Sequence, residues 1–426
     1  MLWRGNPRSG PPRPAGRRWA SLAGVVALSG TALAAMPAPA YAASVPCNDA
    51  ALVTAVAGVA TTGGTLTLAP GCTYTLTAAD NPNNGLAVIT ASVSITGANS
   101  TIQRSSTAPS FRIFEVGSGG TLSLTGLTLR GGSVSGQGGG VRVDSGGTLN
   151  TTRTQFINNT ASGVGGGVSV STGGTSTSSG DTYSDNSATS GGAVSSEGTT
   201  TLTNATVTRN EGGEAGGVNN DTDSSNITIS NSTFTRNVVN GDGDGAAGDF
   251  DGGTVKISNS SFSLNTTTIV GTDAFAGAIY NDANMTMTGV VITRNTLRSD
   301  GTFAEGGGIY NDLDGNLTLV NTSVNANSVI GTADDDGGGI YNDGTLALQR
   351  STVNANTVTN GVAGGIFNDT GTLTATGSTI SGNTSSDAPG GISNDSGTVT
   401  LTGSVVGGNK PTNCAGSPTP IAGCTG

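Results

Sequence analysis

The 426-residue sequence contains no histidine, and this absence removes several kinds of catalytic and metal site. Without an imidazole the chain cannot form a Ser-His-Asp triad, a Cys-His dyad or a histidine-ligated metal centre. Aromatic residues make up only 4% of the chain and charged residues only 11%. No apolar stretch after the first 42 residues approaches the roughly 20 residues that are needed to cross a bilayer, so we expect a protein that does not span the membrane.

The first 42 residues have the features of a secretory signal peptide. They carry five arginines, continue with an apolar run from Trp19 to Met36 and end in the small-residue triplet Ala40-Tyr41-Ala42. This order is typical of a segment that is cleaved during export. We therefore predict a signal peptide at 1–42 and a secreted, extracellular protein that is either free or held at the cell surface.

Cleavage of this segment makes the remaining chain strongly acidic. Five of the 17 Lys and Arg residues lie in it and none of the 28 Asp and Glu residues, which leaves 12 basic residues and a net charge of −16. We therefore expect no nucleic-acid partner, because binding to nucleic acid depends on cationic contacts to phosphate. Cations, cationic surfaces and neutral glycans remain open as partners.

The four cysteines form two pairs that are close in sequence, Cys47 with Cys72 and Cys414 with Cys424. In an oxidising compartment we expect each pair to form a disulfide, although four cysteines allow three pairings. Disulfides at these positions would hold the two ends of the mature chain, where fraying begins.

Two signals recur along most of the sequence. The first is an aliphatic or aromatic residue that closely follows glycine, in most units a Gly-Gly pair, and it returns at intervals of 24 to 32 residues. These ten residues are Val141, Val168, Val194, Val218, Phe250, Ile279, Ile309, Ile340, Ile366 and Ile392. The second is an apolar residue followed three positions later by Asn, as in Phe156-Ile157-Asn158-Asn159. The Asn of this signal occurs in all ten units, at Asn159, Asn186, Asn210, Asn237, Asn265, Asn295, Asn327, Asn356, Asn383 and Asn409.

The repeat predicts an all-β fold, a right-handed single-stranded parallel β-helix. Each unit holds about three short strands separated by Gly, Asn and Asp turns, and it can bury its apolar face only against its neighbours. We assign the β-helix to residues 65–409 and an N-terminal cap to 43–64, where Asp49 followed by 50–60 reads as a short capped helix. Residues 410–426 are expected to form a C-terminal cap or tail.

The paired signals resemble the GGA(I/L/V) and FxxN repeats of the polymorphic outer membrane protein family, within the pectin-lyase-like β-helix superfamily. The resemblance lies in residues such as 191–194 and 277–279 together with 156–159 and 234–237, and it extends over about 138–409. It implies the β-helix fold. Members of the family resemble surface adhesins, so the resemblance also implies an adhesive role.

An acidic residue follows the first signal by three positions in eight of the ten units. These acids are Asp144, Glu197, Asp221, Asp282, Asp312, Asp343, Asp369 and Asp395. Carboxylates stacked on successive coils repel one another, so a compensating interaction is needed. Either the aspartates cap backbone N–H groups at a turn, or Ca²⁺ lies between the coils. The recurring Asn is interpreted as a structural ladder of amides that bond to one another along the axis.

The loops before the Gly-Gly pair are longest in the central units, and their extra residues are acidic. The segment from Gly241 to Gly253 carries four aspartates on a glycine-rich frame, and it is the candidate Ca²⁺ site, against the alternative of a solvated loop. Its four candidate ligands are Asp242, Asp244, Asp249 and Asp251. No other cofactor is expected.

One residue after the first signal, four aromatic residues should point away from the interior, because side chains alternate along a strand. They are Tyr280, Tyr310, Tyr341 and Phe367. Such a stripe would either hold a glycan by ring stacking or be covered by the loops as a separate packing cluster.

The pattern favours a secreted, monomeric, non-catalytic protein that binds a polysaccharide or a cell-surface glycan, with Ca²⁺ as an optional stabiliser. A residue that is copied on every coil has a structural environment shared by all coils, whereas catalysis needs a unique one. The alternative is a polysaccharide lyase or hydrolase of the pectin-lyase-like superfamily, in which Arg209, Arg236 or Arg294 would supply the base.

Overall fold

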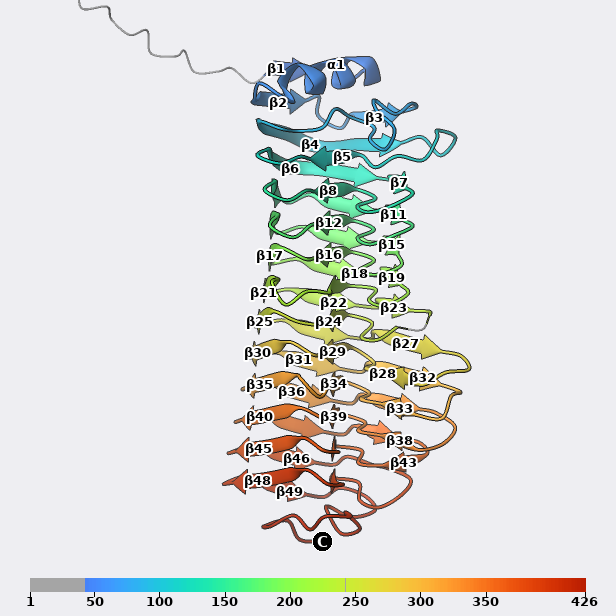
Figure 1. Ribbon diagram of the computed structural model, residues 1–426, viewed down its shortest axis with the longest axis vertical. Coiled ribbons are helices and arrows are strands. Elements are labelled where there is room, and N and C mark those ends of the chain that lie inside the picture. The colour runs from blue at the N-terminus through green and yellow to red at the C-terminus, as the bar shows by residue number, and fades with distance from the viewer. Residues whose placement is uncertain (1–42, 242) are drawn as a thin grey trace, which may run out of the picture. The chain divides into compact units, whose positions relative to one another are not determined.

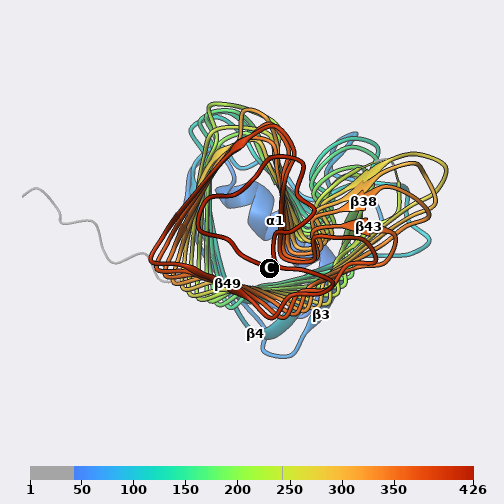
Figure 2. The ribbon, with the colours of Figure 1, turned by 90° about the horizontal axis from the view of Figure 1, so that it is seen from below.

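The computed structural model describes residues 43–241 and 243–426, and the predicted signal peptide at 1–42 lies outside this range. The described residues form a right-handed parallel β-solenoid, as the repeat predicts. Figure 1 shows the strands stacked in chain order, with each coil pairing to the coil before and the coil after. Seen along its axis in Figure 2, successive coils superimpose, so the turns of one coil lie over the turns of the next.

The described residues form four parallel sheets, and the largest of them runs from the first strand to the last. The 25-stranded sheet takes two strands from most coils: β1 (Ala43–Val45), β2 (Gly64–Leu68), β3 (Thr73–Leu76), β4 (Ser92–Arg104), β6 (Thr121–Arg130), β9 (Thr148–Thr152), β10 (Gln155–Ile157), β13 (Thr175–Ser179), β14 (Thr182–Ser184), β17 (Thr199–Thr203), β18 (Thr206–Thr208), β21 (Asn226–Ser230), β22 (Thr233–Thr235), β25 (Thr254–Ser258), β26 (Ser261–Ser263), β30 (Asn284–Thr288), β31 (Val291–Thr293), β35 (Asn316–Val320), β36 (Ser323–Asn325), β40 (Thr345–Gln349), β41 (Thr352–Asn354), β45 (Thr372–Thr376), β46 (Thr379–Ser381), β48 (Thr398–Thr402) and β49 (Val405–Gly407).

The remaining strands lie, in chain order, between the strands of the 25-stranded sheet, and they form the other three sheets. The 11-stranded sheet consists of β5 (Phe114–Val116), β8 (Val141–Val143), β12 (Val168–Val170), β16 (Val194–Ser196), β20 (Val218–Asn220), β24 (Gly248–Phe250), β29 (Ile279–Asn281), β34 (Ile309–Asn311), β39 (Ile340–Asn342), β44 (Ile366–Asn368) and β47 (Ile392–Asn394). The nine-stranded sheet consists of β7 (Ser133–Val134), β11 (Thr160–Ala161), β15 (Ser187–Ala188), β19 (Glu211–Gly212), β23 (Val238–Val239), β27 (Thr266–Ile269), β32 (Thr296–Ser299), β37 (Ser328–Ile330) and β42 (Thr357–Val358). The four-stranded sheet consists of β28 (Ala274–Phe275), β33 (Ala304–Glu305), β38 (Asp335–Asp336) and β43 (Gly361–Val362).

The coils therefore hold more strands than the three that the sequence predicts. The long acidic loops of the central coils are not irregular: they pair with one another as the four-stranded sheet, which projects to one side of the solenoid in Figure 2. This sheet places two loop acids of successive coils side by side, Glu305 on β33 and Asp336 on β38.

The core is a continuous column of inward-facing apolar side chains. Along β29, Ile279 and Asn281 are fully buried while Tyr280 between them points outward, as alternation requires. Identical or similar side chains stack on successive coils, as Phe156 does on Tyr183, with ring centroids 4.8 Å apart and planes at 3°. Each coil thus buries its apolar face on its neighbours.

One position of the repeat differs from its sequence-based assignment. Strand register aligns Gly248, and not Phe250, with Val218 and Ile279, so the prediction that Phe250 marks the first signal is wrong by two residues. The Phe250 ring turns into the space that an aliphatic side chain fills in other coils, and a Cβ on Gly248 would lie 2.5 Å from that ring. Phe250 is fully buried, so its ring fills the core volume that the aliphatic side chain fills in the other coils.

A helix and two disulfides lie at the ends of the described solenoid. The helix α1 spans Asp49–Val59, and its N-cap is Asn48, whose side chain accepts a hydrogen bond from the N–H of Ala51, and not Asp49 as the sequence suggests. Its Leu52 and Val56 are buried in the core. The predicted disulfides Cys47–Cys72 and Cys414–Cys424 are both present. Within the described ranges, no helix is long and apolar enough to cross a membrane.

Candidate functional site

The four aromatic residues predicted to face outward form one ladder on the 11-stranded sheet. Strand register places Tyr280, Tyr310, Tyr341 and Phe367 side by side on four successive coils. Their ring centroids are 5.4, 4.9 and 5.2 Å apart, and their planes lie within 16° of parallel. We call these four residues the aromatic ladder.

The faces of the inner rings of the aromatic ladder are covered by their neighbours. Tyr310 is 8% exposed and Tyr341 is 6% exposed, and Phe275 of β28 packs against Tyr310 with the ring centroids 5.0 Å apart. Of the two interpretations of the sequence, this arrangement favours the packing cluster over an open stripe. A sugar ring has no access to the faces of Tyr310 and Tyr341, so only ring edges and hydroxyl groups are available to a ligand.

The tyrosine hydroxyls are directed at the carboxylates of the following coil. The Tyr280 hydroxyl donates to Asp312 Oδ2, and the Tyr341 hydroxyl donates to Asp369 Oδ2 at 3.4 Å. Burial, followed by the nearby carboxylates, raises the pKa of Tyr280 and Tyr341, so both hydroxyls keep their protons and act as donors at neutral pH.

These carboxylates belong to an acidic row in the turn after the 11-stranded sheet. Because the register of β24 is corrected by two residues, Asp251 joins this row, which then occupies eight consecutive coils. The row consists of Glu197, Asp221, Asp251, Asp282, Asp312, Asp343, Asp369 and Asp395. The turn-capping interpretation is confirmed for two members, since Asp312 accepts the N–H of Leu313 at 2.7 Å and Asp343 accepts the N–H of Thr370 at 3.3 Å.

A second set of acids borders the aromatic ladder from the projecting four-stranded sheet. Burial, followed by repulsion from Asp336, raises the pKa of Glu305 to about 8. Burial likewise raises the pKa of Asp336 to about 7 and that of Asp244 to about 7. Burial therefore destabilises the ionised form of the carboxylates near the aromatic ladder. Binding of a proton or a cation would offset this loss of solvation.

The predicted Ca²⁺ ligands are only partly within the structure. Asp242 lies outside the described residues, whereas Asp244, Asp249 and Asp251 are described. Asp249 occupies the outward position of β24, in register with Tyr280, and is only 5% exposed. Within 43–241 and 243–426, no three Asp, Glu or Cys side chains are grouped closely enough to form a ready-made metal site.

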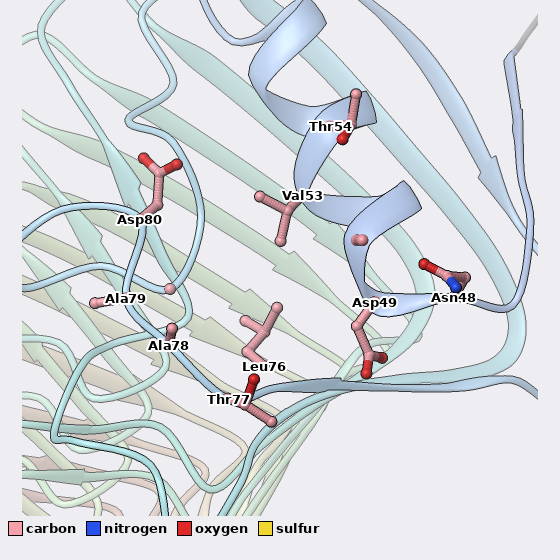
Figure 3. A pocket seen from close by; sticks show the side chains of 11 residues that line it. Asn48, Asp49, Val53, Thr54, Leu76, Thr77, Ala78, Ala79 and Asp80 are labelled. Carbon is pink, nitrogen blue, oxygen red and sulfur yellow. The ribbon is translucent and has the colours of Figure 1, made fainter.

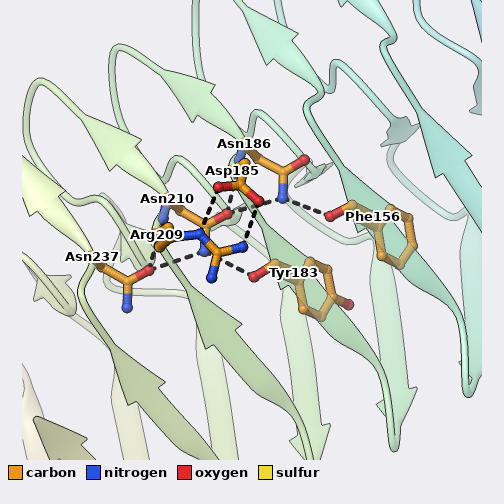
Figure 4. A network of polar contacts seen from close by, with 7 residues as sticks. All are labelled: Phe156, Tyr183, Asp185, Asn186, Arg209, Asn210 and Asn237. Carbon is orange, nitrogen blue, oxygen red and sulfur yellow. Dashed lines mark hydrogen bonds and ion pairs between the residues drawn. The ribbon is translucent and has the colours of Figure 1, made fainter.

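The recurring Asn residues form the predicted amide ladder in the interior. Figure 4 shows part of it: Asn186 Nδ2 donates to Asn210 Oδ1 at 2.9 Å and to the carbonyl of Phe156 at 2.9 Å. The Asn186 backbone N–H also donates to Asn210 Oδ1, at 3.0 Å. The same three bonds recur from coil to coil, so the structural interpretation of this Asn series is confirmed.

A second buried amide ladder was not anticipated. Asn281, Asn311, Asn342 and Asn368 each donate from Nδ2 to Oδ1 of the Asn one coil further on, and the series ends at Asn394. The signal was available: each of these residues stands two positions after an inward-facing Ile, and residues two apart in a strand share a face.

The arginines considered as catalytic bases lie elsewhere. Arg209, Arg236 and Arg294 occupy left-handed turn positions, with φ of 55°, 56° and 57°, just before the first amide ladder. Arg209 forms two hydrogen bonds of 2.8 Å to the carboxylate of Asp185, also drawn in Figure 4. These arginines therefore stand at a different turn of the coil from the aromatic ladder.

A hollow of about 720 Å³ lies beside α1, away from the aromatic ladder. Figure 3 shows Val53 of the helix facing Leu76 across it, with Asp49 and Asp80 at its edges. The Asp49 carboxylate already accepts the N–H of Thr75 at 2.6 Å. This hydrogen bond links the start of α1 to β3 beside the hollow.

Comparison with known proteins finds a similarity in structure. No protein-family model matches the sequence, and no curated protein matches it. The structure is similar to that of PfbA, a surface adhesin of Streptococcus pneumoniae, with a TM-score of 0.41 and 13% identity over 80% of this chain and 90% of that chain. The solenoid fold is shown by the strand pairing of the chain itself, and the particular repeat family has no support from a family model. At this low similarity the resemblance says nothing about the ligand.

Proposed function

We propose that this protein is a secreted, monomeric, non-catalytic β-solenoid that adheres to a polysaccharide or a cell-surface glycan. The supporting observation is the parallel run of tyrosine hydroxyls and carboxylates on consecutive coils. A polymer with a repeating unit would meet the same acceptors and ring edges on each coil. The disulfides Cys47–Cys72 and Cys414–Cys424 support an oxidising, extracellular location.

The aromatic ladder and the carboxylates beside it form one face of the solenoid, which we call the acidic face. Its negative charge indicates which glycans can bind. Carboxylates stand on both sides of the aromatic ladder, so an acidic polysaccharide would be repelled. A neutral or amino-bearing glycan would instead donate hydrogen bonds to these carboxylates. We therefore expect retention of neutral and cationic polymers and exclusion of uronic acid polymers.

The test is retention of the purified chain on immobilised neutral, amino-bearing and acidic polysaccharides, performed in the presence of a chelator. The double variant Asp312→Asn with Asp343→Asn removes two charges but keeps the size of the side chains and their capacity to accept the turn N–H groups. We expect it to weaken retention at least about tenfold, which corresponds to about 1.4 kcal/mol. The matched control is Asp387→Asn, which also replaces an acid by its amide but at an exposed position outside the acidic face.

Two results would overturn the proposal. One is equal retention of the double variant and the wild type, or no retention by either. The other is the appearance of new reducing or unsaturated sugar ends during incubation, which would favour the lyase or hydrolase alternative. Circular dichroism of each variant establishes that the solenoid is intact.

A further inference from the structure

Two buried oxygen atoms at the start of the aromatic ladder lack a hydrogen-bond donor. Asn219 and Asp249 are register partners on β20 and β24, and Asp249 is in turn the register partner of Tyr280. Asn219 is 0% exposed and Asp249 is 5% exposed. Asn219 Oδ1 and Asp249 Oδ1 both have no partner among the described residues. Oxygen atoms buried in this way are costly unless something else binds them.

The orientation of the Asn219 amide is determined by its surroundings. Its Nδ2 donates to Asp221 Oδ1 at 2.6 Å. Turning the amide over would place its oxygen against that carboxylate and lose this bond. Asn219 Oδ1 therefore stays without a donor, one coil away from the unpartnered Asp249 Oδ1.

Further carboxylates surround these two oxygens. Burial, followed by the charges of Asp251, Asp244, Glu214 and Asp221, raises the pKa of Asp249 well above its ordinary value. Asp221, Asp251 and Glu214 are exposed and Asp244 is half-buried, so Asp249 lies at the base of an acidic group that opens to solvent. In the described residues, every ion pair of an Arg or Lys is made with an acid outside this group.

We propose that Asn219, Asp221, Asp249 and Asp251 bind a divalent cation, Ca²⁺ by their ligand chemistry, between two successive coils. The ligands would be amide and carboxylate oxygens, and Ca²⁺ accepts six to eight such oxygens in irregular geometry with water completing the shell. This site goes beyond the proposed glycan binding and does not depend on it.

The assignment differs from the four aspartates that the sequence suggested. Asp242 lies outside the described residues, and Asp244 is placed at the edge because its Oδ1 already accepts the N–H of Phe275 at 3.2 Å. Asn219 and Asp221 of the preceding coil replace them. Because no three acids are preassembled, the carboxylates must rearrange on binding, which predicts the weak affinity of extracellular sites, Kd about 10⁻⁴ to 10⁻³ M.

The first test uses Tb³⁺ as a luminescent substitute for Ca²⁺ on the full chain. Tyr280 stands one coil from Asp249, so excitation of tyrosine should sensitise Tb³⁺ emission, and Ca²⁺ should displace it. We expect Asp249→Asn and Asp251→Asn each to weaken binding at least about tenfold, and Asp387→Asn to leave it unchanged. Emission that is absent, or that persists undiminished in Asp249→Asn, would overturn the assignment.

The second test separates a cation from a proton as the compensating charge. We expect Ca²⁺ in the millimolar range to raise the Tm of the wild type at pH 7.5 by several degrees and to leave that of Asp249→Asn unchanged. In a chelator, Asp249→Asn should be more stable than the wild type, because it removes a buried charge. A wild type that is stabilised by acid but not by Ca²⁺ would show that a proton alone compensates the site, and the proposal would be wrong.

Discussion

Buried amides are the polar residues on which the interior of this solenoid depends. Asn295, in the middle of the first ladder, donates to Asn327 Oδ1 at 2.9 Å and to the carbonyl of Phe262 at 3.0 Å, and its Oδ1 accepts from Asn265 Nδ2 at 2.9 Å. Every polar atom of the side chain is thus partnered. This complete pairing allows a polar residue to repeat on each coil of a dry interior.

Removing one amide should therefore lower the free energy of unfolding by more than the hydrogen bonds that this amide donates, because a neighbouring amide also loses its acceptor. Asn295→Ala leaves Asn265 without the acceptor of both its backbone N–H and its Nδ2, so we expect a loss of at least about 3 kcal/mol in the free energy of unfolding. Asn295→Asp should also destabilise, because a carboxylate cannot donate to Asn327. Guanidinium unfolding monitored by circular dichroism measures both effects.

The control for this prediction is Asn284→Ala, at an exposed position of β30, which should change the free energy by less than about 0.5 kcal/mol. If Asn295→Ala and Asn284→Ala were equally mild, the amide ladder would not be a source of stability.

At this scale the sequence predicts some roles and hides others. The first Asn series was recognisable because its spacing from an apolar residue is constant. The second series was missed because an Asn before an Asp and a Gly, as at Asn342, is also typical of a tight turn. Burial of the aromatic ladder was one of two alternatives that the sequence left open, because it depends on Phe275, which lies on a loop strand that gives no strand signal in the sequence.

At the scale of the strand, more than one pair of inward-facing residues can fill the same volume of the core. In β24 the positions held elsewhere by an aliphatic residue and an Asn are held by Gly248 and Phe250. The replacement interrupts the second amide ladder, and Asn281 Oδ1 is consequently left without a partner. The two residues form a coupled pair, because the small residue makes room for the large one.

This coupling predicts a strongly non-additive double variant. Gly248→Ile alone should clash with the Phe250 ring, and Phe250→Asn alone should leave a cavity, so each should lower the free energy of unfolding by about 3 kcal/mol. Together they should restore the common arrangement, in which Asn at 250 donates to Asn281. We expect a coupling free energy of about 2 kcal/mol or more.

The measurement is a double-mutant cycle from guanidinium unfolding of the four chains. A double variant whose destabilisation equals the sum of the two single effects would contradict the predicted exchange of side chains.

Element boundaries show the same limits of prediction. The helix was expected at its observed place, but its cap was assigned to Asp49 because Asn48 and Asp49 are both favourable caps. Phe250 was misassigned because size and hydrophobicity alone do not reveal strand register. The long acidic loops gave no strand signal, since β33 and β38 contain the acidic residues Glu305, Asp335 and Asp336, which rarely occur in strands.

For the whole molecule, the buried acids of the projecting sheet make stability depend on pH. The pKa of Glu305 is raised to about 8 and that of Asp336 to about 7, with burial as the main cause in both. The carboxylates facing Glu305 are Asp336, Asp369, Asp273 and Asp343. The folded chain therefore retains protons that the unfolded chain releases near its ordinary values of 4.5 and 3.8. Their stabilising effect is complete below these values and is lost as the pH rises toward about 8.

We accordingly expect the Tm of the whole chain, measured in chelator, to fall between pH 5 and pH 9. Glu305→Gln should raise the Tm at pH 9 by roughly 2 to 5 °C and leave it unchanged at pH 5. Glu211→Gln, at an exposed position, should match the wild type at both pH values. Calorimetry that shows the same profile for Glu305→Gln and the wild type would contradict this origin of the pH dependence.

Both amide ladders have a direction, because every amide-to-amide bond runs from Nδ2 to an Oδ1 on the following coil, and the first ladder ends in the segment after the last strand. Asn409 Nδ2 donates to Asn413 Oδ1, and Asn413 Nδ2 donates to the carbonyl of Thr425. The segment after the last strand thus offers Asn409 an amide oxygen, the same kind of acceptor that each coil offers to the coil before it. Tandem duplication or loss of one full repeat would therefore leave the amides of the first ladder matched, with no change at its C-terminal end.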